Sequence, residues 1–185
     1  MSRLEDNVDR ILYSEQQIQD RIKELGAQIS ADYEGKKPLL VSVLKGSVVF
    51  MADLMRSITI PCSIDFMAIT SYPGETTVAL HEPKLLKDLD GPISGMDVII
   101  VEDIFDSGKT LQKLCEMLLK PRNPASLRIC TLLDKPDRRA KGVTIKPDYV
   151  GFSNIPNEFI IGYGLDYNQL YRNLPYIGIL KDSAK

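Results

Sequence analysis

The sequence predicts an α/β fold with a mostly parallel central sheet and helices on its faces. Segments typical of strands and of helices alternate along the chain. Two short runs, 38–44 and 97–101, are almost continuously apolar, which is typical of strands that are covered on both faces. The 185 residues, of which 44% are hydrophobic, suffice for one domain with its own core, so residues 1–185 are expected to form a single domain.

Capping residues predict where the first helix begins. Ser14 and Gln17 have the spacing of a capping box, in which each side chain meets the backbone of the other residue. The pattern then continues toward Gly35, where a turn is expected. The apolar face of this helix is Ile18, Ile22, Leu25 and Ile29.

The remaining elements follow from periodicity and from turn residues. Residues 71–83 contain Pro, Gly and two Thr and are expected to form an exposed excursion. Residues 153–176, rich in Gly, Pro, Asn and Tyr, are expected to form a small irregular cap. The expected strands are 38–44, 63–70, 97–101, 126–133, 149–152 and 177–180, and the expected helices after the first are 47–57 and 109–120.

Composition excludes several classes of protein. The net charge is −2 and the pI about 5.5, so the basic excess of a protein that coats nucleic acid is missing. No apolar run approaches the roughly 18 residues that span a bilayer, so no membrane partner is expected. An odd number of cysteines (Cys62, Cys115, Cys130) without a CxxC pair favours reduced thiols and a cytoplasmic location. A single histidine, His81, leaves little material for a multi-histidine metal site.

The residues that carry chemistry gather in 101–110, VEDIFDSGKT. Glu102, Asp103 and Asp106 come at the carboxyl end of the expected buried strand, and ligands of open α/β sheets bind at that edge. Residues 107–110 then offer backbone amides and hydroxyls at the start of a helix, where the dipole favours an anion. The segment therefore predicts a phosphate site preceded by carboxylates.

The identity of the phosphate ligand depends on the neighbouring acids. The ending Gly108-Lys109-Thr110 resembles a nucleotide-triphosphate P-loop, but that pattern needs glycine where this chain has Asp103. Two adjacent carboxylates beside a phosphate suit a sugar phosphate, because they can accept hydrogen bonds from vicinal ribose hydroxyls. The alternative is a solvated acidic turn in which the acids serve only the helix N-terminus.

This segment resembles the phosphoribosyl-pyrophosphate-binding motif of type I phosphoribosyltransferases. From Leu39 to Leu180 the chain is similar to the hypoxanthine-guanine phosphoribosyltransferase family. That resemblance implies a purine salvage enzyme, which transfers a phosphoribosyl group to hypoxanthine or guanine and gives IMP or GMP plus pyrophosphate. The other landmarks are Leu44-Lys45-Gly46, Ser71-Tyr72, Leu132-Leu133-Asp134-Lys135, the stretch 146–152 and the stretch 162–167.

The resemblance assigns the phosphoribosyl-pyrophosphate site. It implies that Glu102 and Asp103 hold the ribose hydroxyls, directly or through Mg²⁺, and that Asp106 is the acid/base group at the imidazole ring of the purine. It implies that the pyrophosphate is bound by Lys45, Gly46 and Arg172, with a cis peptide before the lysine. The residues implied to bind the 5′-phosphate are Ser107, Gly108, Lys109 and Thr110.

The resemblance also assigns the purine site. Lys135 would donate to the oxygen at position six, Phe159 would stack on the base, and backbone groups of Ile160 would meet its edge. Asp166 is assigned to this purine side and to a second Mg²⁺, so the implied metal ligands are Glu102, Asp103 and Asp166.

The resemblance further implies a lid, a hood and an oligomer. The lid is expected over about 71–84, starting at Ser71-Tyr72, and the hood over about 153–176 with the N-terminal region. A homodimer or homotetramer is expected. Two departures stand out: 73–82 lacks the Ser/Gly-rich character of many relatives, and 152–156 is one residue longer than in some, which could shift the base-stacking phenylalanine.

Several alternatives stay open at the level of sequence. Lys45 could be a surface lysine closing a strand, Lys135 a solvated lysine in a basic loop with Arg138, Arg139 and Lys141, Phe159 a core residue, and Asp166 a turn residue. Two other functions compete: a nucleotide-sensing regulator of the same fold that binds RNA, and a transferase acting on xanthine or a pyrimidine. The acidic pI opposes the first, and a lysine followed by the phenylalanine region favours an oxopurine.

Overall fold

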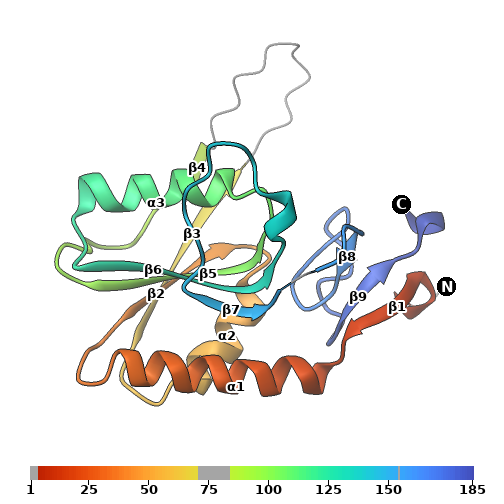
Figure 1. The fold of residues 1–185 in the computed structure, drawn as a ribbon, viewed down its shortest axis with the longest axis horizontal. Coiled ribbons are helices and arrows are strands. Elements are labelled where there is room, and N and C mark those ends of the chain that lie inside the picture. The colour runs from red at the N-terminus through yellow and green to blue at the C-terminus, as the bar shows by residue number, and fades with distance from the viewer. Residues whose placement is uncertain (1–3, 71–83, 154) are drawn as a thin grey trace, which may run out of the picture.

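A six-stranded sheet forms the centre of the molecule (Figure 1) in this computed structural model, which describes residues 4–70, 84–153 and 155–185. Its strand order is β4-β3-β2-β5-β6-β7, and every neighbouring pair is parallel except β3 and β4. The predicted α/β fold with a mostly parallel sheet is therefore confirmed. The strands are β2 (Leu39–Leu44), β3 (Ser63–Thr70), β4 (Lys84–Lys87), β5 (Asp97–Phe105), β6 (Ser126–Asp134) and β7 (Tyr149–Phe152).

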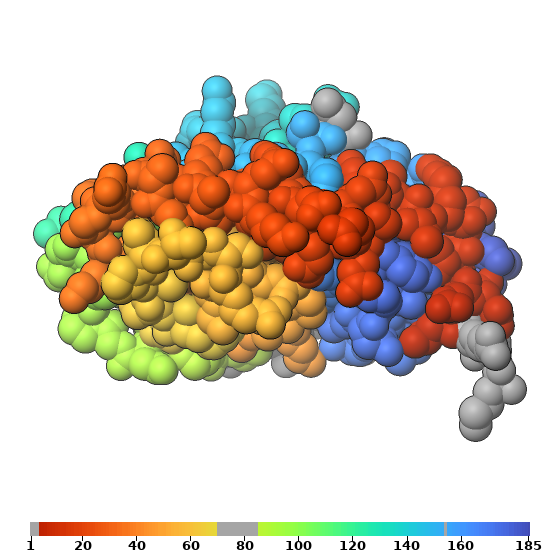
Figure 2. All heavy atoms as spheres, turned by 90° about the horizontal axis from the view of Figure 1, so that it is seen from below, coloured from red at the N-terminus to blue at the C-terminus, as the bar shows by residue number. Residues whose placement is uncertain are grey.

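Three helices cover the two faces of this sheet. Helices α1 (Glu15–Asp32) and α2 (Val48–Ser57) lie on one face, which Figure 2 shows in orange and gold, and α3 (Lys109–Arg122) lies on the other. Ile99 packs into the cluster under α1 and α2, whereas its neighbour Ile100 packs into the cluster under α3. Both residues are fully buried, as expected of a strand covered on both faces.

Helix α1 begins where its capping residues predict. The Ser14 hydroxyl accepts from the Gln17 amide at 3.3 Å, and the Gln17 side-chain oxygen accepts from the Ser14 amide at 2.9 Å. The predicted apolar face is completely buried, but the helix ends at Asp32, before the turn that contains Gly35. The helical expectation for 109–120 is likewise met, with α3 running on to Arg122.

A second, antiparallel sheet of order β1-β9-β8 stands beside the carboxyl ends of the parallel strands, on the right of Figure 1. Its strands are β1 (Val8–Tyr13), β8 (Ile160–Ile161) and β9 (Ile177–Leu180), flanked by the short helices η1 (Leu4–Asn7) and η3 (Asp182–Ala184). The sequence analysis missed β1, β4 and β8. Each of them exists through pairing with a distant strand, and β8 is too short to show a period.

Strand β5 corrects one expected boundary. It was expected to end at Val101, but it continues to Phe105 because its parallel ladder with β6 persists as far as the pair Phe105–Asp134. The acids at 102 and 103 therefore belong to the strand and do not form a loop after it. Within the described residues, no helix is long and apolar enough to cross a bilayer. The expected lid at 71–84 lies, apart from Lys84, outside the described residues.

Candidate active site

Two adjacent carboxylates near the end of β5 are desolvated. One carboxylate oxygen of Glu102, Oε2, is buried and has no hydrogen-bond partner among the described residues. Burial, together with the charge of Asp103, raises the pKa of Glu102 well above its usual value. Burial also raises the pKa of Asp103 to about 6, although its Oδ1 accepts from the Ile104 amide at 2.7 Å. A buried carboxylate oxygen without a donor, such as Glu102 Oε2 among the described residues, points to a partner from outside the chain.

Glycines let the loop after β2 approach Asp103 and let the stretch 162–167 approach that loop. A Cβ on Gly46 would lie 1.7 Å from Asp103 Oδ2, and a Cβ on Gly164 would lie 2.0 Å from the Gly46 carbonyl oxygen. The close approach of the loop after β2 to Asp103, and of the stretch 162–167 to that loop, therefore requires positions without side chains. The Leu44–Lys45 peptide bond is cis, as the resemblance implied.

Cations line the side of the site formed by this loop and the stretch 162–172. Arg172 forms an ion pair with Asp166 at 2.8 Å and donates to the Gly164 carbonyl at 2.7 Å. Lys45 is exposed, and its Nζ donates to Gln169 Oε1 at 3.1 Å. Asp166 Oδ2 also accepts from the Gln169 amide at 2.8 Å, so this acid shapes a turn as well as facing Arg172.

The turn between β5 and α3 presents backbone donors. Gly108 has φ +78° and precedes the first residue of α3, whose N-terminus has no side-chain cap. Within the described residues, the amides of residues 107–110 donate to no backbone acceptor. The Ser107 carbonyl, by contrast, is held by the Ala140 amide at 3.0 Å. The free N–H groups at a helix N-terminus make this turn a suitable phosphate cradle.

A cavity of about 1090 Å³ opens next to these acids. Lys135 is only 7% exposed, and its Nζ donates to the Glu158 carbonyl at 3.2 Å. Burial lowers the pKa of this lysine. The alternative of a solvated loop lysine is therefore wrong. The residues that line the cavity include Asp103, Asp106, Lys135, Arg138, Phe159 and Asp166.

The aromatic wall of this cavity is Phe159. Its side chain is 41% exposed, so the alternative of a core residue is wrong, and its ring meets Tyr167 edge to face with centroids 5.1 Å apart. Ile160 follows it in β8 and is buried against β9. An exposed aromatic face beside a buried ammonium suits a flat heteroaromatic ligand that carries an acceptor.

The sequence analysis missed the residue that connects the candidate phosphate turn (residues 106–110) to the loop after β6. Arg139 donates through Nη1 to the carbonyl oxygens of Phe105 (2.6 Å), Asp106 and Lys135 (3.3 Å). Its guanidinium also lies 3.4 Å from the centroid of the Phe105 ring and pairs with Asp134. The only local signal for it was a basic loop, which by itself indicates a solvated surface.

The described residues contain no group of three acidic, histidine or cysteine side chains close enough together to hold a metal ion. The carboxylates of Glu102, Asp103 and Asp166 thus do not close a cage by themselves. Magnesium, however, is commonly bound by one or two carboxylates together with substrate phosphates and water. The unpartnered Oε2 of Glu102 and the neighbouring Asp103 fit that mode of binding.

The comparisons with known proteins agree with this geometry. Residues 10–168 match the family model of the phosphoribosyl transferase domain, and the chain belongs to this family. Its relatives include the hypoxanthine-guanine phosphoribosyltransferase of Streptococcus mutans, which is 54% identical over 98% of both chains. The relative of that name from Streptococcus agalactiae is 53% identical over 97% of both chains.

Solved structures agree as well. A hypoxanthine phosphoribosyltransferase from Staphylococcus aureus superposes with a TM-score of 0.90 at 48% identity, covering 98% of this chain and 96% of that one. The hypoxanthine phosphoribosyl transferase of Trypanosoma cruzi superposes with a TM-score of 0.88 at 40% identity, covering 98% and 96%. The fold is therefore the type I phosphoribosyltransferase fold that the sequence predicted.

Proposed function

We propose that this chain is a purine salvage enzyme that transfers the phosphoribosyl group of phosphoribosyl pyrophosphate to hypoxanthine or guanine. The products are IMP or GMP and pyrophosphate. The observation that carries the proposal is the buried Lys135 ammonium, which shares one cavity with the exposed ring of Phe159 and with Asp106. An ammonium has donors and no acceptor, so it suits the oxygen at position six of an oxopurine.

The residues around the ribose suit the charge that develops during transfer. As the bond from the anomeric carbon to pyrophosphate breaks, positive charge builds on the ribose ring. Glu102 and Asp103 are proposed to hold the ribose hydroxyls, and preorganised carboxylates in a desolvated site stabilise such charge. The departing pyrophosphate gains negative charge, which Lys45, the amide of Gly46 and Arg172 are proposed to meet.

The remaining assignments concern the phosphate and the base. The amides and hydroxyls of residues 107–110 are proposed to bind the 5′-phosphate. Asp106 is proposed to take the proton from the imidazole nitrogen of the purine as the opposite nitrogen attacks the sugar. Phe159 stacks on the base, the backbone of Ile160 meets its edge, and Lys135 holds its oxygen.

Magnesium is part of the proposal. Glu102, Asp103 and Asp166 would supply carboxylates to it, together with oxygens of phosphoribosyl pyrophosphate. The bound ion would neutralise charge on the leaving pyrophosphate. The unpartnered buried oxygen of Glu102 supports this assignment.

The proposed setting of the enzyme is the cytoplasm, as a homodimer or homotetramer without a nucleic-acid or membrane partner. Three free cysteines, two of them buried, support a reducing compartment. A lid that includes Ser71 and Tyr72 is proposed to exclude water from the reactive sugar. Size-exclusion chromatography with light scattering measures the oligomer directly.

The experiment that tests the function is a base panel. Purified protein, phosphoribosyl pyrophosphate and Mg²⁺ are mixed separately with hypoxanthine, guanine, xanthine, adenine and uracil, and nucleotide formation is followed. We expect turnover with hypoxanthine and guanine and its loss when a chelator removes the metal. Turnover with uracil alone would favour a pyrimidine transferase, turnover with xanthine alone would assign a different oxopurine, and no turnover with any base would refute the enzymatic proposal.

A further inference from the structure

Arg138 lines the cavity together with the two residues that it contacts, Asp106 and Asn157. It is the last residue of the short helix η2 (Pro136–Arg138), which follows β6. Its Nε donates to Asp106 Oδ1 at 2.7 Å, and its Nη1 donates to Asn157 Oδ1 at 2.5 Å. These partners lie 32 and 19 residues away along the chain, so one guanidinium connects three separate segments.

The first contact leaves Asp106 with one free carboxylate oxygen. Oδ1 is occupied by Arg138, whereas no donor among the described residues reaches Oδ2. The backbone of the same residue is held independently, since its carbonyl accepts from Arg139. Nearby, burial lowers the pKa of the Lys135 ammonium, and the carboxylates of Asp106 and Glu158 partly offset this shift. The Asp106 carboxylate thus has a fixed orientation with Oδ2 available to a ligand.

The second contact reaches the segment that carries the aromatic wall. Asn157 lies between β7 and β8, two residues before Phe159. The Arg138 fork therefore spans from the acid at the phosphate turn to the stretch that would stack on a base. A planar guanidinium holds both partners in fixed directions, whereas an ammonium is a compact charge on a flexible stem and sets no such geometry.

We propose that Arg138 is a positioning residue, which holds the Asp106 carboxylate and the Phe159 segment in register for the transfer reaction. The inference rests on the proposed function and adds a residue that the sequence analysis placed only in a solvated basic loop. A purely structural role is a poor account of the contact, because the two side chains of this ion pair are 48% and 38% exposed and such pairs add little to stability.

The experiment compares Arg138 variants with a matched ion pair far from the site. Arg138→Gln and Arg138→Lys are assayed beside wild type and Arg128→Gln. Arg128 pairs with Asp32 at 2.8 Å, and these side chains are 40% and 40% exposed, so its pair closely resembles that of Arg138. The readouts are kcat and the KM values for base and for phosphoribosyl pyrophosphate, with thermal unfolding to verify that each variant is folded.

We expect Arg138→Gln to lower kcat by roughly 10- to 100-fold, since small misplacements of a reacting group cost up to about 10²-fold. The KM for phosphoribosyl pyrophosphate should change by less than about threefold. Arg138→Lys keeps the charge and loses the fork, so its kcat should fall between those of wild type and Arg138→Gln. Arg128→Gln should keep the wild-type kcat.

The double variant Asp106→Asn/Arg138→Gln tests whether Arg138 acts through Asp106. If it does, the second substitution adds almost nothing to the first, whereas independent residues give additive losses. Additive losses would overturn the inference, as would a kcat for Arg138→Gln within about twofold of wild type. A KM for phosphoribosyl pyrophosphate that rises as much as kcat falls would make Arg138 a direct ligand instead. Absence of turnover in wild type would refute the proposed function, a different outcome from all of these.

Discussion

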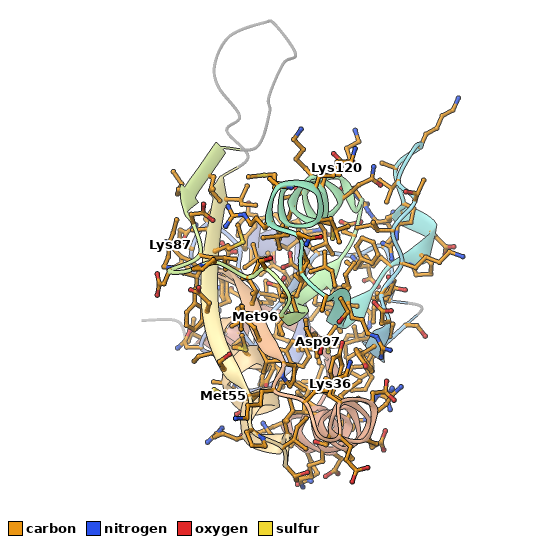
Figure 3. The ribbon with its side chains drawn as sticks, turned by 90° about the vertical axis from the view of Figure 1, so that its left-hand side faces the viewer. Lys36, Met55, Lys87, Met96, Asp97 and Lys120 are labelled. Atoms are coloured by element: carbon orange, nitrogen blue, oxygen red, sulfur yellow. The ribbon has the colours of Figure 1, made fainter. Side chains whose placement is uncertain are left out.

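The two ends of the central strands differ in how their charges are paired. At the amino ends, Asp97 of β5 accepts from Lys36 at 3.2 Å and from the Ser126 hydroxyl at 2.5 Å. Arg128 of β6 donates to Asp32 at 2.8 Å and to the Tyr149 hydroxyl at 2.6 Å. Figure 3 views this end, with Lys36 and Asp97 labelled close together. These polar groups form closed networks.

At the carboxyl ends of the same strands, several ion pairs also form, but two charged groups have no charged partner among the described residues. Within the part of the chain that the structure describes, no donor reaches the buried Oε2 of Glu102, and the Lys135 ammonium donates to a carbonyl alone. The pKa of Asp97 is lowered, chiefly by its hydrogen bond from Ser126, whereas burial raises the pKa of Asp103 on the same strand. Ionisation of Asp97 therefore stabilises the ligand-free fold, whereas ionisation of Asp103 on the same strand destabilises it. Unpaired charge of this kind marks the end that is organised for a ligand.

The largest expected effect is at Asp106. Asp106→Asn keeps the size of the side chain and removes its ability to take a proton, so we expect kcat to fall by roughly 10²–10⁴-fold. Binding of phosphoribosyl pyrophosphate should persist, because the amides of residues 107–110 are unchanged. Steady-state kinetics and calorimetric titration measure the two effects. Rates near wild type would reduce Asp106 to a residue that merely shapes the turn.

The next effect is at Lys135. Lys135→Met keeps the length of the side chain and removes its donors, which leaves the oxygen of a buried oxopurine unpaired at a cost of roughly 1–3 kcal/mol. We expect kcat/KM for hypoxanthine and guanine to fall together by about 5- to 150-fold, with the affinity for phosphoribosyl pyrophosphate nearly unchanged. Discrimination against adenine should shrink, since its amino group no longer faces an ammonium.

A parallel loss of affinity for phosphoribosyl pyrophosphate would instead place Lys135 at a phosphate. The matched control is Lys109→Met, which removes an exposed lysine of the phosphate turn. That variant should weaken phosphoribosyl pyrophosphate and leave the ratio between bases intact.

Asp103 tests whether an ionised carboxylate at the carboxyl end of β5 destabilises the ligand-free protein. Its folded-state pKa of about 6 exceeds its usual value of 3.8, so the folded protein binds more protons than the unfolded chain between these pH values. The stability of the ligand-free protein should therefore fall as pH rises from about 4 to above 6. Asp103→Asn removes this term and should raise the free energy of unfolding by about 1–3 kcal/mol at pH 7.5.

Well below pH 3.8, Asp103 is protonated in both states, and the advantage of the variant should vanish. Urea unfolding at about pH 3 and about pH 7.5 measures the difference. An Asp103→Asn variant less stable than wild type at neutral pH would show that this carboxylate is paired in the ligand-free protein, and the contrast between the two strand ends would fail.

The smallest effect is expected at the amino ends. Arg128→Gln removes an exposed ion pair with Asp32 and a hydrogen bond to Tyr149, so the free energy of unfolding should fall by only about 0.5–1 kcal/mol. The kcat should stay at the wild-type value, because these contacts lie at the opposite end of the strands from the cavity. A loss of turnover comparable to that of the Lys135 variant would contradict the division between the two ends.

Much of the fold was predictable because its determinants are local. The capping box at Ser14, the buried runs of β2 and β5, and the turn at Gly108 each depend on neighbours a few residues away. The acids of β5 and the amides of 107–110 are adjacent in sequence, so a site for ribose and phosphate could be inferred from one short segment. The resemblance to phosphoribosyltransferases then extended the inference to the distant residues.

Other features required the tertiary structure, because they depend on contacts between distant segments. Strands β1 and β8 exist through their pairing with β9, and β5 runs four residues beyond its apolar run because β6 continues beside it. Packing buries Lys135 but leaves Arg138 and Arg139 more exposed, although all three belong to one basic loop. Contacts between distant segments also determine at which end of a strand the charged groups are paired and at which end some lack a charged partner. A sequence specifies where the charges are along the chain, and only packing determines which of them meet.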